Sequence, residues 1–292
     1  MIENEVSRQD AKNAGSGSGA QSRFAAPAPS RETPCAPLPV SVVMIAKDEE
    51  QNIEAALASV AGADEIVVIV DVESSDATAE ISGRFTERVY LRPWTGYAAQ
   101  KQAAIDLAAG PWVFLLDADE RVTPELAREI GQAVERHASG GGGGVFGYYV
   151  ARRNFFLGRW IRHGGWWPDY TLRLFRKDRA HVQPRLVHER VVVDGETEYL
   201  KHPFEHYTYK NLAEFEKKMQ RYSALSADEL VIKRTRRAGV FSIVVRPAAT
   251  FLKMYILRGG FLDGMHGLIL ALLYGFSTFL KYAKAWEKRP DR

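Results

Sequence analysis

The sequence predicts an α/β fold with a parallel sheet, followed by a helical C-terminal region. Three observations support this prediction. Short apolar runs alternate with helical patterns between residues 40 and 116, as in strands that are joined by crossover helices. Acidic residues closely follow three of these runs: Asp48, Asp71 and the pair Asp117 and Asp119. In the last quarter of the sequence, long apolar runs are separated by basic residues.

The composition is that of an ordinary globular protein. The 292 residues are enough for one large domain or two modest ones, with 46% hydrophobic and 26% charged residues. The single cysteine, Cys35, excludes an internal disulfide framework and fits a reducing compartment. Residues 1–20 contain no apolar core of a signal peptide, so we expect the folded body to stay in the cytoplasm.

The charge is distributed unevenly along the chain. Residues 231–292 contain twelve Lys and Arg against three Asp and Glu, so this segment has a net charge of +9, whereas the whole chain has a net charge of +3. The first 230 residues therefore carry −6. A basic, apolar C-terminal region favours peripheral contact with an anionic membrane. Nucleic acid is not expected as a partner, because long apolar runs separate the basic residues.

The elements expected in the first half follow in strand–helix order. Residues 1–38 are rich in Ala, Gly, Ser and Pro without apolar periodicity, which predicts a disordered segment. Four buried strands are expected after it, at residues 40–46, 65–70, 89–91 and 112–116. Helical patterns separate them: one at residues 53–60 with Gly62 as its C-cap, one capped by Ser74, Ser75 or Asp76, and one at residues 96–109.

The acidic residues stand where a parallel α/β sheet binds ligands, at the carboxyl ends of its strands. Burying two neighbouring carboxylates such as Asp117 and Asp119 without a partner is costly. A divalent cation with a phosphate-bearing ligand would supply that partner, since Mg²⁺ and Mn²⁺ prefer oxygen ligands. By itself the Asp-x-Asp pattern also fits a solvated strand end followed by a turn. The convergence of this pair with Asp48 and Asp71 favours a ligand site.

In order, the segments at these strand ends resemble the family 2 glycosyltransferases. They are Ala46-Lys47-Asp48-Glu49-Glu50, then residues 71–78, then Asp117-Ala118-Asp119-Glu120-Arg121. The resemblance implies a GT-A fold, which is a Rossmann-like nucleotide-sugar-binding domain. It implies transfer of a sugar from a nucleotide-sugar donor to an acceptor, with a divalent cation, Mg²⁺ or Mn²⁺, as cofactor.

Later segments narrow the resemblance to the lipopolysaccharide core β-1,4-glucosyltransferases of Gram-negative bacteria. They are Trp94-Thr95-Gly96-Tyr97 with Gln100-Lys101, residues 163–169, residues 173–176 and residues 187–190. The resemblance extends from about residue 40 to about residue 287. The sequence departs from the family pattern after the second strand, where Val72, Ser75 and Ala77 replace Ser, Thr and Gly. The base and the sugar therefore stay open.

The resemblance assigns candidate ligands to the metal. Asp119 is the expected ligand, and Asp117 lies nearer the ribose while it shares the metal site. The alternative is that one of the two only caps the following turn. His188 would complete the metal site or hold the diphosphate, and a purely structural histidine is the alternative.

Four further residues are candidates for binding the nucleotide-sugar. Asp71 would contact the base or the ribose, with a helix N-cap as the alternative. Asp48 and Glu49 would contact the donor ribose, or only favour the first turn of a helix. Lys101 would pair with phosphate, or be a solvated helix residue.

Residues 163–169 form the second dense stretch, His-Gly-Gly-Trp-Trp-Pro-Asp. An inverting transferase needs one carboxylate to take the proton of the acceptor hydroxyl. We predict Asp169 as this base, with Glu189 as the second candidate and a strand cap as the alternative role of Asp169. The two tryptophans would stack on sugar rings or fill the core. Arg173 and Arg176 would bind an acceptor phosphate or lie on an exposed strand face.

The C-terminal region is predicted to be helical. An amphipathic helix is expected at residues 212–230, and apolar runs follow at residues 241–245, 251–257 and 268–280. The longest uncharged run, residues 264–280, is shorter than the roughly 20 residues of a spanning helix. Basic helices lying in the membrane interface fit better, with a helical lid or a dimer surface as the alternative. The expected division is 1–38, 39–209 and 210–292.

These observations predict an inverting hexosyltransferase, with UDP-glucose as the expected donor. Its expected acceptor is a lipid-linked saccharide such as the lipopolysaccharide inner core, at the cytoplasmic face of the inner membrane. One alternative is transfer to another glycan, protein or lipid acceptor. The other alternative is a non-catalytic GT-A module that only binds a nucleotide-sugar.

Overall fold

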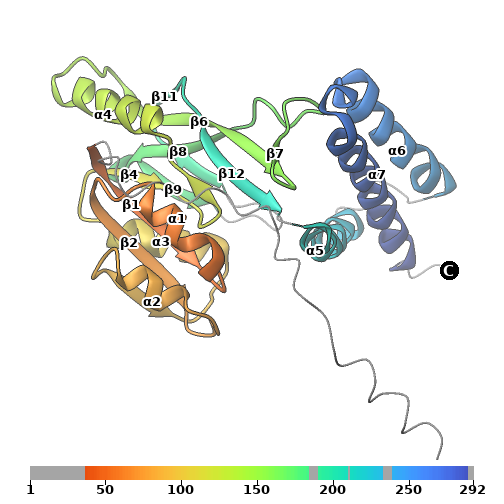
Figure 1. Cartoon of the computed structure of the whole chain (residues 1–292), viewed down its shortest axis with the longest axis horizontal. Helices are drawn as coiled ribbons and strands as arrows, with labels where there is room; N and C mark the ends of the chain where they lie inside the picture. The colour runs from red at the N-terminus through yellow and green to blue at the C-terminus, as the bar shows by residue number, and fades with distance from the viewer. Residues whose placement is uncertain (1–36, 184–189, 210, 233–238, 289–292) are drawn as a thin grey trace, which may run out of the picture.

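The computed structural model describes residues 37–183, 190–209, 211–232 and 239–288. A twisted sheet with flanking helices forms one side of the molecule, and the last three helices lie on the other side (Figure 1). The predicted α/β fold with a helical C-terminal region is confirmed.

The first half of the chain builds the parallel part of the sheet. Its strands are β1 (Leu38–Ala46), β2 (Ala63–Asp71), β3 (Val89–Arg92) and β4 (Trp112–Leu115). Their order in the sheet is β3-β2-β1-β4, and β1 pairs in parallel with both β2 and β4. Three helices connect them: α1 (Glu50–Ala58), α2 (Thr78–Gly83) and α3 (Tyr97–Leu107).

Beyond β4 the sheet becomes mixed. It continues through β8 (Tyr170–Arg176), β6 (Val145–Phe156), β12 (Phe204–Tyr209) and β5 (Glu120–Arg121). Strands β8 and β5 run antiparallel to their neighbours, and β7 (Arg159–Trp160) and β11 (Glu196–Tyr199) pair with β6. Helix α4 (Pro124–Ala138) packs beside β1, and β9 (Ala180–Gln183) forms a separate ribbon with β10 (Arg190–Val193). The parallel sheet expected from the sequence is therefore correct for the first four strands only.

The core lies on both faces of the sheet. Val42 and Met44 of β1 belong to an apolar cluster with α1 and α4. Val43 and Ile45 face the other way, into a cluster with Ile105 of α3. A strand that is covered on both faces needs an uninterrupted apolar run, which is why the sequence of β1 predicts a buried strand so clearly.

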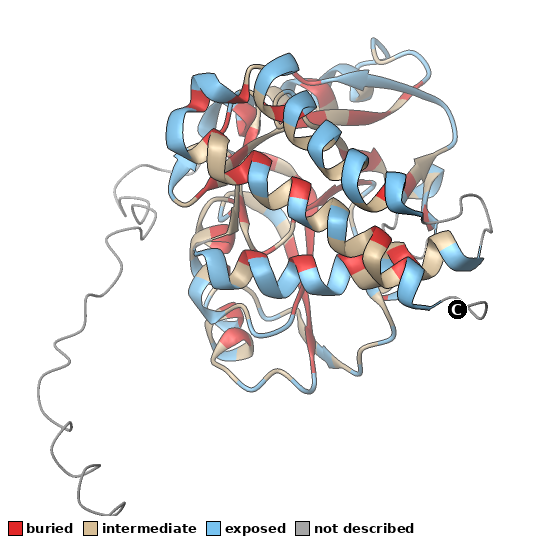
Figure 2. Cartoon of the chain, turned by 90° about the vertical axis from the view of Figure 1, so that its right-hand side faces the viewer, coloured by how far each residue is buried: buried red, intermediate tan, exposed pale blue. Residues whose placement is uncertain are grey.

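The C-terminal region is a helical layer. It contains α5 (Leu212–Ile232), α6 (Val240–Leu252), a π-helical turn (Lys253–Leu257), a 3₁₀ turn (Gly260–Asp263) and α7 (Gly264–Glu287). Helix α7 lies between α6 and the sheet (Figure 1) and joins a third apolar cluster. Figure 2 views the molecule from this side, where pale blue exposed residues line the outer faces of the helices.

The observed boundaries differ from the prediction in several places, and α7, at Gly264–Glu287, extends beyond the expected run at residues 268–280 at both ends. Helix α1 ends at Ala58, four residues before the predicted C-cap Gly62, because residues 59–62 form turns that lead into β2. The two apolar runs expected at residues 241–245 and 251–257 form one continuous helical segment, with Pro247 inside it. The division at residue 209 stays a prediction; β12 ends at Tyr209 and α5 begins at Leu212.

Candidate active site

The carboxyl ends of β1, β2 and β4 meet at one edge of the sheet. Ala46 is paired with Val70 one residue before the end of β2, and Leu116 N donates to Val43 O of β1. This register brings the loop after β1, Asp71 at the end of β2, and Asp117 after β4 to the same edge. The topology predicted from the sequence therefore gathers the acidic strand ends as expected.

Asp117 is held by two cations. Its Oδ1 lies 3.1 Å from Lys101 Nζ, and Arg173 Nη2 donates to its Oδ2 at 2.7 Å. Burial would raise the pKa of Asp117, but the charges of Arg173 and Lys101 lower it well below its usual value. Arg173 also binds the buried Glu120. The backbone N–H of Asp117 donates to Glu120 Oε2 at 3.0 Å. This cluster fixes the loop after β4 as a charged, bonded unit.

For Arg173 and Lys101, the structure rules out the alternative of a solvent-exposed side chain. Arg173 is only 4% exposed, so the alternative of an exposed strand face is wrong for it, because β8 is an inner strand between β4 and β6. Lys101 is 8% exposed and therefore is not a solvated helix residue. Arg176 lies at the end of β8 and pairs with Asp178 at 2.8 Å.

Asp119 meets a histidine that sequence reasoning left unassigned. Its Oδ2 lies 3.4 Å from His206 Nε2 of β12, and Tyr207 N donates to Asp119 O at 2.9 Å. Burial would raise the pKa of Asp119, but the neighbouring His206 lowers it. His206 reaches this position because β12 pairs with β5, which follows Asp119 directly. No sequence motif marks His206; only the strand pairing identifies it.

A hydrogen-bonded chain leads from His206 to Asp169. His206 Nδ1 lies 2.6 Å from Asn154 Oδ1, and Asn154 Nδ2 donates to Asp169 Oδ2 at 3.1 Å. Arg152 also binds Asp169 Oδ2, at 2.8 Å, while the Asp169 side chain stays 33% exposed. Asn154 is buried, so its amide holds His206 and Asp169 at a fixed distance from each other. The structure thus connects the Asp-x-Asp pair to the predicted base, 50 residues further along the chain.

The orientation of Asn154 determines the tautomer of His206. Asn154 Nδ2 donates to Asp169 and to Trp166 O at 3.3 Å, so Asn154 Oδ1 faces the imidazole and His206 Nδ1 must carry the proton. The other ring nitrogen, Nε2, faces the Asp119 carboxylate at 3.4 Å. A proton on Nε2 or a metal cation between the two atoms would hold them together.

Asp71 is buried and bound to Lys47. Its Oδ2 lies 2.6 Å from Lys47 Nζ, and its Oδ1 accepts from Glu73 N at 3.1 Å. The hydrogen bond from Lys47 lowers the pKa of Asp71 against the effect of burial. The alternative of a helix N-cap is wrong for Asp71, because Asp76 accepts from Thr78 N at the start of α2.

Asp48 and Glu49 join the loops after β1 and β2. Asp48 has φ 54°, a left-handed conformation that Asp tolerates, and its Oδ1 accepts from Ser75 N at 2.8 Å. Glu49 N donates to Thr78 Oγ1 at 2.8 Å, and Glu49 Oε2 accepts from Asn52 Nδ2 at 2.7 Å. These bonds hold the predicted nucleotide side of the site together.

The two tryptophans of residues 163–169 have different surroundings. Trp166 packs edge-on against Phe156 and Tyr274, at centroid distances of 6.1 and 6.2 Å, so it fills the third cluster. Trp167 packs edge-on against Trp160, with 5.4 Å between ring centroids. Stacking on a sugar ring is therefore open to Trp167 rather than to Trp166.

The remaining predicted residues, His188 and Glu189, lie outside the described residues. Among the residues that are described, no group of three or more His, Cys, Asp and Glu side chains could hold a metal ion. At the strand ends that carry the Asp-x-Asp pair, Asp119 and His206 offer two potential metal ligands.

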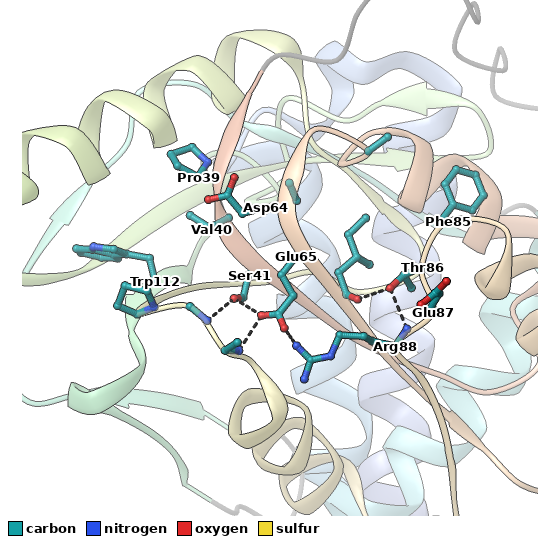
Figure 3. A pocket seen from close by; sticks show the side chains of 16 residues that line it. Pro39, Val40, Ser41, Asp64, Glu65, Phe85, Thr86, Glu87, Arg88 and Trp112 are labelled. Atoms are coloured by element: carbon teal, nitrogen blue, oxygen red, sulfur yellow. Dashed lines mark hydrogen bonds and ion pairs between the residues drawn. The ribbon is translucent and has the colours of Figure 1, made fainter.

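A hollow of about 720 Å³ lies at the opposite edge of the sheet, where β1, β2 and β4 begin (Figure 3). Its central carboxylate, Glu65, accepts from Ser41 Oγ and from Ala109 N, and pairs with Arg88. Thr86 caps the same region by donating to Ile66 O at 2.8 Å. The polar groups of this hollow bind one another, so we assign it a structural role.

The chain is similar in sequence to known glycosyltransferases. Residues 41–195 match the model of the glycosyl transferase family 2. The lipopolysaccharide core biosynthesis glycosyltransferase LpsC of Rhizobium meliloti (strain 1021) is 29% identical over 263 residues, which cover 86% of this chain and 93% of LpsC. An uncharacterised glycosyltransferase of Rickettsia typhi is 26% identical over 257 residues, 85% of this chain and 87% of that protein.

One solved structure with a similar fold is the mannosyltransferase PcManGT from Pyrobaculum calidifontis, in complex with GDP-Man and Mn²⁺. The alignment has a TM-score of 0.45 at 15% identity and covers 88% of this chain and 92% of the PcManGT chain.

The family match spans Asp48, Asp71, Asp117, Asp119 and Asp169, and it includes more than half of the chain. The chain therefore belongs to the family 2 glycosyltransferases, and it is an enzyme of the transferase class with the predicted GT-A fold.

Proposed function

We propose that this enzyme is an inverting hexosyltransferase whose acceptor is a lipid-linked saccharide such as the lipopolysaccharide inner core, with UDP-glucose as the expected donor. The observation that carries the proposal is the chain Asp119–His206–Asn154–Asp169. It holds an acidic metal-binding position and an exposed carboxylate base in one rigid arrangement. Similarity to LpsC along most of both chains supports the choice of acceptor.

The residues present fit a divalent cation. Asp119 and His206 offer a carboxylate oxygen and an imidazole nitrogen 3.4 Å apart. Mg²⁺ and Mn²⁺ often take few protein ligands and complete their shell with phosphate oxygens and water. Bound here, the cation would neutralise the diphosphate of the leaving group. Asp117, with both oxygens held by cationic side chains, would orient the ribose; His188 stays a predicted further ligand.

Asp169 has the properties of the base. Its known partners, Arg152 and Asn154, both bind Oδ2, and the side chain is one-third exposed, so an acceptor hydroxyl can approach the carboxylate. The acceptor hydroxyl gives its proton to Asp169 while the hydroxyl oxygen attacks the anomeric carbon of the donor, and the nucleoside diphosphate departs. Glu189 stays the second candidate.

The test is donor turnover by the purified full chain. A panel of UDP- and GDP-sugars is incubated with Mg²⁺ or Mn²⁺, with and without a purified lipopolysaccharide core acceptor. We expect metal-dependent release of nucleoside diphosphate from one donor, stimulated by the acceptor. Asp169→Asn should lower acceptor-dependent kcat by about 10²–10⁴-fold while nucleotide binding persists, whereas Asp178→Asn, in an exposed ion pair, serves as the control.

Each other outcome selects a different reading. Release without stimulation keeps the transferase and replaces the acceptor by another glycan, protein or lipid. Nucleotide-sugar binding without release on any acceptor indicates the non-catalytic module. Full transfer by a folded Asp169→Asn protein removes Asp169 from the role of base.

A further inference from the structure

The C-terminal helices expose apolar side chains in a regular pattern. On α6 and the π-helical turn that extends it, a stripe of exposed apolar residues follows a spacing of three or four positions: Phe241, then Val244 or Val245, then Ala248, Leu252 and Ile256. The segment between α6 and α7, residues 253–263, is called the elbow below. Its residues Leu257, Phe261 and Leu262 continue the exposed apolar surface toward α7. Only 11% of the window Val240–Leu257 is buried, although its mean hydropathy is 1.5. A helix that turns its apolar stripe outward needs a partner for it.

The start of α7 is bonded to the catalytic body, and its end is bonded to helix α5 of the same C-terminal layer. At its start, Asp263 Oδ2 accepts from His163 N at 2.8 Å. Near its end, Lys284 Nζ donates to Gln220 O at 2.9 Å and Ser223 Oγ at 2.8 Å, both on α5. A span would place these two ends on opposite sides of a hydrocarbon layer of about 30 Å. A span would also draw the charged helix α5, to which the end of α7 is bonded, toward that layer, which favours a position of α7 and α6 beside a membrane.

The charges around the apolar stripe have one dominant sign. Residues 240–288 contain six basic residues, Arg246, Lys253, Arg258, Lys281, Lys284 and Lys288, against Asp263 and Glu287. Asp263 is buried and bonded to His163, so it adds little to the surface charge. Lys253 and Arg258 are exposed between the apolar residues of the elbow. Apolar side chains flanked by cations fit an anionic bilayer, whereas two copies of this face would bring like charges together.

The elbow also holds the loop that carries Asp169. Gly164 N donates to Arg258 O at 2.9 Å, and His163 Nδ1 lies 3.2 Å from Asp263 Oδ1. Gly165 has φ 88°, a backbone conformation that favours glycine, and it packs directly against the Arg258 side chain. From Trp166 the chain connects to Asn154 and so to Asp169. The surface elbow and the base are thus parts of one bonded unit.

We propose that the docking face, defined as Phe241, Val244, Val245, Leu252, Ile256 and Leu257, lies in the plane of an anionic lipid bilayer. Docking by this face holds the Asp169 loop at the bilayer surface, where a lipid-linked acceptor presents its sugars. The inference rests on the proposed function only for the nature of the acceptor; the binding of lipid stands by itself.

The test is sedimentation of the full chain with vesicles, without donor or acceptor. We expect binding to phosphatidylcholine vesicles that contain phosphatidylglycerol, and weaker binding to phosphatidylcholine alone. Leu252→Glu/Ile256→Glu should weaken binding to the anionic vesicles by at least about tenfold, and Lys253→Glu should reduce the preference for anionic lipid. Leu91→Glu is the matched control, because Leu91 is 62% exposed on β3, outside the docking face.

Three results would overturn the proposal. One is that the wild-type protein does not sediment with either vesicle. Another is that Leu252→Glu/Ile256→Glu still binds, or that Leu91→Glu loses binding equally. The third is a wild-type dimer in light scattering that becomes a monomer on Leu252→Glu/Ile256→Glu without any lipid binding. Thermal unfolding confirms that each variant is folded, and because no sugar is present, failure of vesicle binding is distinct from failure of donor turnover.

Discussion

Asp117 and Asp119 stand two residues apart and meet different partners. Asp117 is bound by Lys101 and Arg173, whereas Asp119 faces the imidazole of His206. Their side chains diverge, and each reaches an element from a different part of the chain. This difference assigns the two acids different chemistry, and it leads to three predictions for single residues.

His206→Ala should raise the Mn²⁺ concentration for half-maximal donor turnover by at least about tenfold, because it removes a ligand facing Asp119. The measurement is turnover over a metal titration. His202→Ala is the matched control, since His202 pairs with Glu129 at the surface. An unchanged metal titration for the His206 variant would contradict the assignment.

Arg173→Met should destabilise the fold by about 3–5 kcal/mol, because it leaves the fully buried Glu120 carboxylate without its cation. Arg173 is the shared partner of Asp117 and Glu120. The measurement is urea unfolding at neutral pH. Arg176→Met, in an exposed pair with Asp178, should change the free energy of unfolding by less than about 1 kcal/mol, and equal losses for the two variants would contradict the prediction.

The stability contributed by Asp117 should depend on pH. Arg173 and Lys101 lower its folded-state pKa below the unfolded value, against the effect of burial. For a carboxyl group with a lowered pKa, the contribution is present above the unfolded pKa of about 3.9 and is lost as the pH falls further. The stability difference between wild type and Asp117→Asn should therefore be largest near neutral pH and shrink below about pH 4. Urea unfolding across this range measures it, and a constant difference would contradict it.

At the scale of elements, β12 and the elbow between α6 and α7 complete the site. Strand β12 pairs with both β6 and β5, and so it carries His206 to Asn154 and to Asp119. The elbow binds the loop before Asp169 through Asp263. Both elements lie far along the chain from the residues they position, so local sequence patterns do not reveal their roles.

Asp263→Ala should lower kcat for sugar transfer by about tenfold, because the loop before Asp169 loses its anchor. The affinity for nucleotide should stay unchanged, since the nucleotide side of the site lies at the ends of β1 and β2. Kinetics and calorimetric titration with nucleotide measure the two quantities, and Asp263→Asn should restore part of kcat. A parallel loss of nucleotide affinity would indicate general damage instead of a positioning role. Asp228→Ala, in a surface pair with Lys288, is the control.

The strands of the parallel half agree with the prediction to within two residues, because burial on both faces demands continuous apolar runs. The short strands β5, β7 and β11 were not expected. They have two or four residues each and exist only through pairing with distant partners. A pattern of two residues carries no periodicity, so the sequence cannot predict such strands.

At the scale of the whole molecule, the docking face and the active site share a rigid connection. The negative charge of residues 1–230 and the positive charge of residues 231–292 would turn the helical layer toward an anionic surface in the proposed docking. An enzyme held in this way searches for its acceptor in two dimensions, at a high local concentration.

Transfer to a core acceptor embedded in anionic vesicles should have a kcat/KM at least about tenfold above that for the delipidated oligosaccharide. The Leu252→Glu/Ile256→Glu protein should lose this preference and retain turnover of the soluble acceptor. Parallel assays with both acceptors measure the ratio. A preference that persists in this variant would show that the lipid is recognised elsewhere.

Local sequence pattern was sufficient for the α/β class, the acidic strand ends, the helical C-terminal region and the family. These features depend on neighbouring residues or on strand order, and both can be read along the chain. Tertiary structure alone identified His206, buried Arg173 between Asp117 and Glu120, and connected Asp119 to Asp169 through Asn154. Such contacts join residues up to 87 positions apart, and only the pairing of strands in three dimensions determines which of them meet.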